Sequence, residues 1–140
     1  MSAYDGLMTT KAKEFRYAVD LGEGSVFRTE DGTPLGSSPE WTPEHLLLAG
    51  LLRCSLHSLS HHARKADIEV THATGSAKAL FARRESDGRF AAADIDVALD
   101  VRLEPQPGEA ELADLLEKAE RDCFIGASLT VKPSYSWNVG

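Results

Sequence analysis

The sequence has little of what marks a secreted or membrane-bound protein. Only two of its 140 residues are cysteine, too few for the disulfide framework that stabilises many small secreted domains. No apolar run approaches the roughly 20 residues of a membrane-spanning helix, and the N-terminal segment MSAYDGLMTT lacks the apolar core of a secretory signal. We therefore expect a cytoplasmic protein with no membrane partner.

Positive charge is scarce as well. The chain carries 15 lysine and arginine residues against 22 aspartate and glutamate residues, a formal net charge of -7, and no basic stripe is interleaved with aromatic residues. Glycine-rich phosphate-binding motifs are absent. Nucleic acid is therefore not an expected partner, and no cofactor or metal is expected.

With 42% hydrophobic residues, the chain is long enough for one core, so we expect a single domain over residues 1–140.

The first half of the chain predicts two strands and a long helix. Residues 15–21 alternate between apolar and polar side chains, the pattern of a half-buried strand, and a glycine-rich turn leads to a short second strand over residues 25–28. After a loop over residues 31–39, Thr42 is a suitable N-cap for a helix that runs over residues 43–66. The leucines of this helix cover more than one face, so a partner subunit is a candidate for its second cover.

The second half predicts two longer strands, a helix and a last strand. The strands run over residues 68–83 and 90–103, and the helix over residues 109–123 has apolar residues at a spacing that points Cys123 inward. Pro133 places the last strand at a sheet edge or a bulge. The strand 90–103 has one apolar and one charged face, so we expect an antiparallel sheet with one solvated face. Strands and helices are segregated along the chain, which predicts an α+β fold.

Cys54 is the first candidate for chemistry. It lies near the middle of the long helix and shares a helical face with His57 and His61. A nearby imidazolium lowers the pKa of a thiol, and the thiolate is the form that attacks a peroxide oxygen. The spacing therefore indicates a thiol that two histidines tune.

Two other interpretations stay open on spacing alone. In the first, Cys54 fills a helix contact and the neighbouring histidines are ordinary surface residues. In the second, Cys54, His57 and His61 hold zinc from one helical face, with Cys123 or Asp122 as a further ligand, although no CxxC or HExxH spacing supports a metal site.

Two segments resemble the family of osmotically induced and organic hydroperoxide resistance proteins, the OsmC/Ohr family. The segments are WTPEHLLLAGLLRC, residues 41–54, and AERDCFIG, residues 119–126. Members carry Pro-Glu followed by Leu and Ala on a central helix, a cysteine ten positions after the glutamate, and a second cysteine late in the chain at the end of a helix. The order of elements is also similar over nearly the whole chain. The matching residues are Pro43, Glu44, Leu47, Ala49, Cys54 and Cys123.

The resemblance implies an OsmC-like fold, in which antiparallel sheets wrap around two central helices in an intertwined homodimer with active sites at the subunit interface. It also implies a peroxidase that reduces organic hydroperoxides, an antioxidant oxidoreductase of the stress response. Cys54 would be the peroxidatic cysteine that becomes a sulfenic acid, and Cys123 the resolving cysteine that forms a disulfide with it. A small dithiol or a lipoyl-type reductant would reset the pair. Leucines around Cys54 would favour apolar hydroperoxides.

Glu44 matches the acid of the family's active site, which pairs with an arginine. On one straight helix Glu44 lies about 15 Å from Cys54 along the axis, so the two would meet more easily across the dimer. An acid in the first turn also stabilises a helix whatever the function. The sequence departs from the family at the arginine, because Asp-Leu stands before the glycine-rich turn. Arg16 and Arg28 are displaced candidates for its role.

These and other departures leave two alternatives to a peroxidase. Phe124 follows Cys123 where the family commonly has proline, and Gly126 stands where it often has serine. The first alternative is a non-catalytic protein that binds an apolar small molecule at the dimer interface or senses oxidation, and the absent arginine favours it. The second is a structural use of both cysteines as packing residues too far apart for a disulfide, which needs Cα atoms within about 7 Å.

Overall fold

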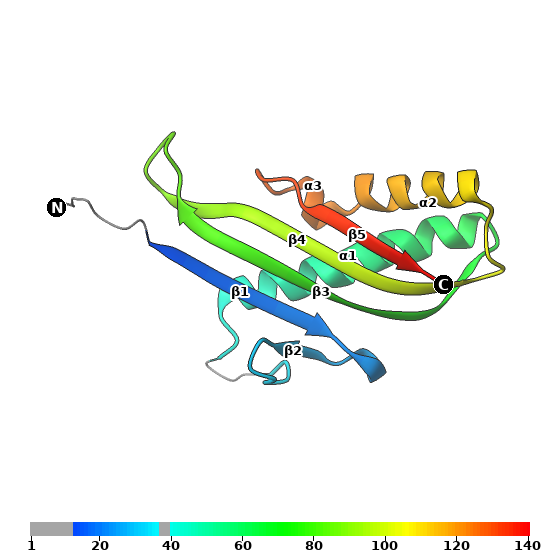
Figure 1. The fold of residues 1–140 in the computed structure, drawn as a ribbon, viewed down its shortest axis with the longest axis horizontal. Coiled ribbons are helices and arrows are strands. Elements are labelled where there is room, and N and C mark those ends of the chain that lie inside the picture. The colour runs from blue at the N-terminus through cyan, green and yellow to red at the C-terminus, as the bar shows by residue number, and fades with distance from the viewer. Residues whose placement is uncertain (1–12, 37–39) are drawn as a thin grey trace.

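Five strands form one sheet in the computed structural model of the protein, which describes residues 13–36 and 40–140 (Figure 1). The strand order is β2-β1-β3-β4-β5. The four strands predicted before the second long helix are confirmed, with small shifts of their ends. The segment MSAYDGLMTT and residues 37–39 of the predicted loop lie outside the described residues. The strands are β1 (Glu14–Leu21), β2 (Phe27–Thr29), β3 (Glu69–Arg83), β4 (Phe90–Glu104) and β5 (Ser134–Val139).

The last strand corrects the expectation of a purely antiparallel sheet. β1 pairs antiparallel with β2 and β3, and β3 with β4, but β5 runs parallel to β4, with Ser134 opposite Asp96. Its predicted edge position is confirmed. After β4 the chain passes through α2 (Glu109–Arg121) and α3 (Phe124–Ala127). A helical crossover of this length returns the chain to the same end of the sheet, which makes the new strand parallel.

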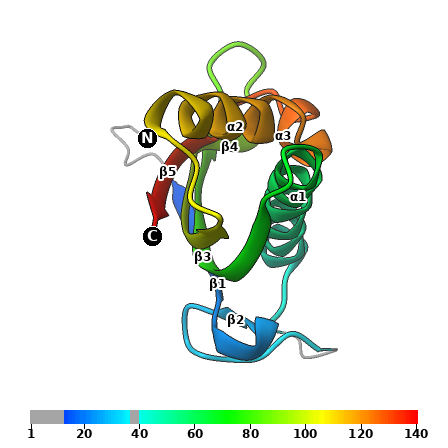
Figure 2. The ribbon, with the colours of Figure 1, turned by 90° about the vertical axis from the view of Figure 1, so that its right-hand side faces the viewer.

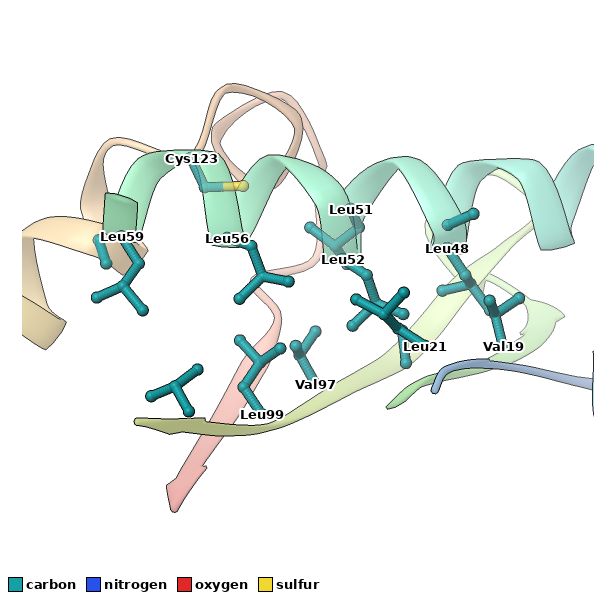
Figure 3. Close-up of a cluster of buried hydrophobic side chains, with 14 of the residues drawn as sticks. Val19, Leu21, Leu48, Leu51, Leu52, Leu56, Leu59, Val97, Leu99 and Cys123 are labelled. Atoms are coloured by element: carbon teal, nitrogen blue, oxygen red, sulfur yellow. The ribbon is translucent and has the colours of Figure 1, made fainter. Parts of the chain in front are cut away.

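One face of the sheet packs against α1 (Pro43–Lys65), the long helix that the sequence predicted. Thr42 caps it as expected, because its hydroxyl accepts the His45 N–H while the His45 ring accepts the Thr42 N–H. Figure 3 shows leucines of α1 pointing toward residues of β1 and β4. Full burial of one leucine contributes roughly 1.5–3 kcal/mol, so this contact sets the position of α1. The fully buried leucines of α1 are Leu48, Leu51, Leu52 and Leu59.

The alternation predicted for β4 is confirmed, and that predicted for β1 only in part. On β1, Val19 and Leu21 are buried, but Phe15 is 44% exposed and contacts Phe90 edge-on, with 5.8 Å between ring centroids. Phe15 stays exposed because this end of the sheet extends past α1 (Figure 1). On β4 the buried side chains are Ile95, Val97, Leu99, Val101 and Leu103.

Helix α2 lies across the top of α1 and the sheet (Figure 2) and buries Leu115 and Ala119. The predicted helix is confirmed with a shifted end, because α2 stops at Arg121, two residues before Cys123, which has an extended backbone as the N-cap of α3. Cys123 nevertheless points inward as predicted and is 0% exposed. None of the described helices is long and apolar enough to cross a membrane.

The face of α1 that turns away from the sheet is uncovered in the single chain. It carries Leu46, which is 50% exposed, the exposed residues Gly50, His57 and His61, and between them the half-buried Cys54. These five residues, spaced by three or four positions, form the outer stripe of α1. Cys54 therefore lies on a helix face that another molecule can approach.

Candidate functional site

The structure brings the two cysteines together within one chain. Cys54 comes from the middle of α1, and Cys123 from the junction of α2 and α3. The Cys54 sulfur accepts a hydrogen bond from the Ile125 N–H at 3.4 Å, and the Cys123 sulfur accepts one from the Gly126 N–H at 3.5 Å. Both thiols are free, and their side chains interact with each other. Both sulfurs therefore lie at the start of α3.

Burial raises the pKa of the Cys54 thiol above its usual range. The hydrogen bond from the Ile125 N–H lowers this pKa, the neighbouring Cys123 raises it, and the Phe124 N–H lowers it. The main contributions include neither of the histidines that the sequence predicts as tuning groups. The groups that stabilise a thiolate at this position are backbone N–H donors, to which no sequence pattern pointed.

A pocket of about 410 Å³ opens beside Cys54. His57 and His61 line it, so the predicted histidines face the same space as the thiol. Phe124 is 80% exposed and supplies its apolar surface. No leucine lines it, because the buried leucines of α1 point to the sheet, so the expectation of leucines around Cys54 is wrong. The residues that line this Cys54 pocket are Cys54, His57, Ser58, His61, His62, Asp122 and Phe124.

His62 and Asp122 link α1 to the segment that carries Cys123. The His62 Nε2 atom lies 2.7 Å from an Asp122 carboxylate oxygen, and hydrogen bonds from Arg121 and His62 lower the pKa of Asp122 to about 2. Because Asp122 directly precedes Cys123, this pair holds the second cysteine against α1. Among residues 13–36 and 40–140, no group of three or more His, Cys, Asp or Glu side chains could hold a metal ion. The zinc alternative therefore lacks a ligand set.

Two hydroxyl groups lie next to Cys123, and the sequence did not link either of them to it. The buried Ser55 hydroxyl donates to the Leu51 carbonyl at 2.8 Å and lies 2.8 Å from the Tyr135 hydroxyl and 3.6 Å from the Cys123 sulfur. Since the Ser55 proton is directed to Leu51, Tyr135 is the donor to Ser55. Burial raises the pKa of Tyr135 well above its usual value, so the phenol keeps its proton at neutral pH.

Glu44 does not meet Cys54 within one chain. It is half-buried in the first turn of α1, near Tyr17 of β1. Burial raises the pKa of Tyr17, and Glu44 raises it further through its negative charge and a hydrogen bond. The local contact of Glu44 is therefore with the sheet.

The two arginines predicted to replace the missing family arginine have local partners. Arg16 pairs with Glu14 at 3.2 Å, and Arg28 donates to the Gly32 carbonyl at 3.0 Å. Within the part of the chain that the structure describes, no hydrogen bond or ion pair joins either arginine to Cys54. A single chain thus leaves the role of the arginine unfilled.

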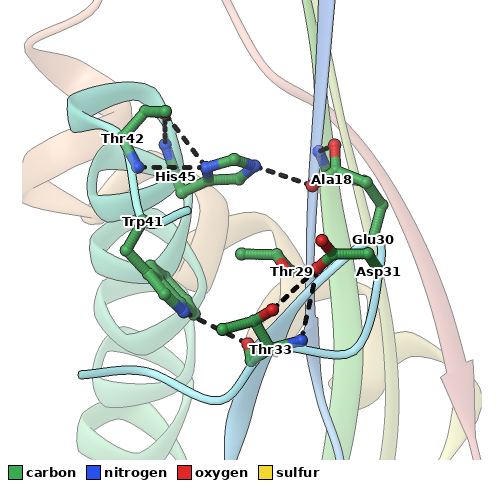
Figure 4. Close-up of polar contacts among 8 residues, drawn as sticks. All are labelled: Ala18, Thr29, Glu30, Asp31, Thr33, Trp41, Thr42 and His45. Carbon is green, nitrogen blue, oxygen red and sulfur yellow. Dashed lines mark hydrogen bonds and ion pairs between the residues drawn. The ribbon is translucent and has the colours of Figure 1, made fainter. Parts of the chain in front are cut away.

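A hydrogen-bond network fixes the start of α1 against the sheet (Figure 4). The Thr42 N–H donates to His45 Nδ1 at 3.2 Å, so the proton of the neutral ring is on Nε2, which donates to Glu30 at 2.7 Å. The other Glu30 oxygen accepts the Ala18 N–H of β1 at 3.1 Å. This network was not expected from the sequence, and it holds the turn that carries Glu44.

The fold and the two cysteines together define a class of protein. The sheet packs against a long helix that has a free cysteine at its middle, and a second free cysteine lies beside it at the start of a late, short helix. The class is that of a protein with a pair of neighbouring free thiols. A model of the family "OsmC-like protein" matches residues 36–138, and the chain belongs to that family.

Solved structures show the same fold. An OsmC-like protein of unknown function from Vibrio cholerae is 15% identical with a TM-score of 0.62, and the match covers 91% of this chain and 99% of that chain. The organic hydroperoxide resistance protein OhrB of Bacillus subtilis is 20% identical with a TM-score of 0.51 and coverages of 94% and 98%. An OsmC-like protein from Mycoplasma pneumoniae is 17% identical with a TM-score of 0.57 and coverages of 95% and 98%. No curated protein matches the chain by sequence.

Proposed function

We propose that the protein is a thiol peroxidase that reduces organic hydroperoxides through Cys54 and Cys123. The observation that carries the proposal is the meeting of both sulfurs at the start of α3, where Cys54 accepts the N–H of Ile125, two residues beyond Cys123. Membership of the OsmC-like family and the fold shared with an organic hydroperoxide resistance protein support it. A reducing compartment such as the cytoplasm would keep both thiols free between turnovers.

The chemistry needs two steps. In the first, the Cys54 thiolate attacks the terminal oxygen of the hydroperoxide, the O–O bond breaks, and the alcohol leaves after taking up a proton. In the second, the Cys123 thiol attacks the Cys54 sulfenic acid, which forms the disulfide and releases water. The hydroperoxide gains two electrons and the cysteine pair loses two. A dithiol then returns the pair to the thiol state.

Neutral donors would take the place of the arginine that peroxidase members use. The N–H groups of Ile125 and Phe124 favour the Cys54 thiolate. Ser58, four positions after Cys54, lines the same pocket, and its buried hydroxyl has no hydrogen-bond partner among the described residues. A buried hydroxyl without a partner costs about 1–3 kcal/mol.

The test is quantitative thiol titration with intact-mass analysis, before and after one equivalent of cumene hydroperoxide. We expect the loss of both thiols and of two hydrogen atoms, with cumyl alcohol formed in equal amount. Hydrogen peroxide serves as the comparison, and we expect it to react more slowly, because the exposed Phe124 ring favours an apolar substrate. Thiols that remain unchanged under an excess of cumene hydroperoxide would rule out the peroxidase.

The outer stripe of α1 supports a homodimer as part of this proposal. Residue 49 is the midpoint between Glu44 and Cys54, so an antiparallel pair of α1 helices crossing at Ala49 and Gly50 would place Glu44 level with the partner's Cys54. Glu44 and Cys54 are about 15 Å apart along one helix, but in such a pair Glu44 of one chain would lie opposite Cys54 of the other. Leu46, 50% exposed in the single chain, would be covered.

Analytical ultracentrifugation tests the dimer. We expect a species of about 30 kDa, twice the 15.2 kDa of the chain, and we expect Gly50→Glu to shift it to the monomer because a charge would be buried at the crossing. Leu35→Glu, a change at a residue that is 49% exposed and lies outside α1, is the control and should remain dimeric. A monomeric wild type, or a Gly50→Glu variant that stays dimeric, would contradict this packing.

A sensor of oxidation is the second candidate function. The unfilled role of the arginine favours it, because Arg16 and Arg28 have local partners and a sensor needs only one oxidation rather than repeated fast attack on peroxide. A sensor would form the disulfide in a single slow event, and a dithiol would reduce that disulfide too slowly to sustain turnover. Continuous consumption of hydroperoxide in the presence of a dithiol therefore separates the two functions.

A further inference from the structure

A second pocket borders the segment that carries Cys123. It has a volume of about 710 Å³, lies between α2 and the start of β5, and shares no lining residue with the Cys54 pocket. Asp122 and Phe124 face the Cys54 pocket, whereas Gly126 and Ala127 face this one. We call it the α2–β5 pocket. Among the residues that line it are Glu117, Glu120, Arg121, Leu129, Lys132 and Tyr135.

Gly126 and Tyr135 separate the α2–β5 pocket from the Cys123 sulfur. A Cβ atom on Gly126 would lie 3.5 Å from Cys123 Sγ and 3.6 Å from the Tyr135 hydroxyl. Both residues are only partly buried and line the pocket, although Cys123 itself is 0% exposed. Because glycine has no side chain, the wall between the pocket and the sulfur is thin at this point.

We propose that the α2–β5 pocket is the docking site of the dithiol that reduces the Cys54–Cys123 disulfide, and that this dithiol attacks Cys123 past Gly126. The inference rests on the proposed two-cysteine chemistry and adds to it a separate entrance for the reductant. Peroxide would enter on the side of Cys54, and the reductant on the side of Cys123.

The chemistry at Cys54 suits this direction of attack. When a thiolate attacks Cys123, the disulfide bond breaks and the electron pair moves to the Cys54 sulfur, which is the leaving group. A leaving thiol departs faster when its thiolate is stabilised. At Cys54 two N–H groups provide that stabilisation, those of Ile125, which donates at 3.4 Å, and Phe124. Attack on Cys54 would instead expel Cys123, which is fully buried and accepts one N–H, that of Gly126 at 3.5 Å.

The remaining steps balance with a dithiol as the reductant. The first attack joins one reductant sulfur to Cys123 in a mixed disulfide. The second thiol of the same molecule then attacks the reductant sulfur, closes its own disulfide and releases the Cys123 thiolate. Two electrons and two protons pass from the dithiol to the cysteine pair. A monothiol would need a second molecule in the same pocket.

The charges of the pocket favour a small neutral dithiol. Its charged lining residues are two acids, Glu117 and Glu120, and two bases, Arg121 and Lys132, which balance each other. Leu129 and Tyr135 add apolar surface for a short carbon chain. Dihydrolipoamide and dithiothreitol have this chemistry and serve as probes.

The decisive variant is Gly126→Ala, which places a methyl group in the wall. Its contacts at 3.5 and 3.6 Å are ordinary van der Waals distances, so the fold is expected to tolerate it. The Cys54–Cys123 disulfide is first formed with diamide, which needs no peroxidase activity, and its reduction by dihydrolipoamide is then followed by thiol release. We expect reduction to slow by at least about tenfold, and because the disulfide is formed beforehand, the rate of oxidation by peroxide does not enter this comparison.

The control is Gly108→Ala, because a Cβ atom there meets nothing within 4 Å. A bulky variant in the pocket itself, Ala127→Trp, should slow reduction in the same selective way even if Gly126→Ala disturbs α3. Brief treatment of the disulfide with 2-mercaptoethanol, followed by alkylation and peptide mapping, should place the adduct on Cys123. An adduct on Cys54, equal reduction rates in all variants, or no disulfide after diamide would overturn the proposal. If the wild type does not react with hydroperoxide, but its diamide-formed disulfide is reduced as described, only the proposed peroxidase activity is overturned.

Discussion

Replacing Cys54 with serine is expected to lower the rate of cumene hydroperoxide consumption by on the order of 10³-fold or more. The thiolate is the group that attacks the O–O bond, and a serine hydroxyl stays protonated at neutral pH. Ile125 and Phe124 would still present their N–H groups, so the site would keep its shape and lose its nucleophile. The measurement is steady-state consumption of hydroperoxide with dithiothreitol as the reductant.

Two controls accompany the Cys54→Ser variant. Circular dichroism should show an unchanged fold, because Cys54 is only half-buried at the edge of the core and serine has nearly the same size. His57→Ala, in the same pocket, tests the tuning role predicted for that histidine, and we expect a small effect because the imidazole is not a main contributor to the pKa of the thiol. Full activity in Cys54→Ser would contradict the proposed chemistry.

Replacing Cys123 with serine is expected to stop turnover after one equivalent of hydroperoxide. Cys54 would still attack, but no second thiol would be in place to condense with the sulfenic acid. Mass analysis should show the gain of a single oxygen atom, and a sulfenic-acid reagent should label Cys54. Steady-state consumption should fall by at least about 100-fold.

The burial of Cys123 makes this variant informative. Its side chain is 0% exposed and lies 3.6 Å from Ser55, where a serine hydroxyl can form a comparable hydrogen bond, so we expect the fold to persist. Excess hydroperoxide should drive Cys54 of the variant to the sulfinic acid, which the wild type avoids by forming the disulfide. Undiminished turnover in Cys123→Ser would show that an external thiol resolves the sulfenic acid directly.

Much of the fold was predictable because local patterns carry it. The start of α1, with Thr42 as the N-cap and Pro43 at the first helical position, and the alternating buried residues of β4 follow from local patterns. The errors lie where tertiary contacts overrule the local pattern. Phe15 fits a buried strand position but extends past the cover of α1, and the parallel direction of β5 depends on the crossover through α2 and α3.

Gly75 is a residue whose importance only the fold reveals. It lies inside β3, where glycine is normally unfavourable, and no turn requires it. A Cβ atom there would lie 2.6 Å from the Ala98 carbonyl oxygen and 2.7 Å from a Leu99 methyl group of β4. The close approach of the two strands therefore demands glycine, and only the fold shows which residues of β4 approach it.

The sequence alone determined the two cysteines, the long leucine-rich helix and the family. These depend on residue identity and on spacing within one helix, and both can be recognised without knowledge of the fold. Which groups surround the thiols was decided by tertiary structure. Ile125, Ser55 and Tyr135 reach the cysteines from three separate elements, and Tyr135 lies 80 positions from Ser55. Contacts between such distant segments arise only when the sheet, α1 and α3 pack together, since no local pattern records which segments become neighbours.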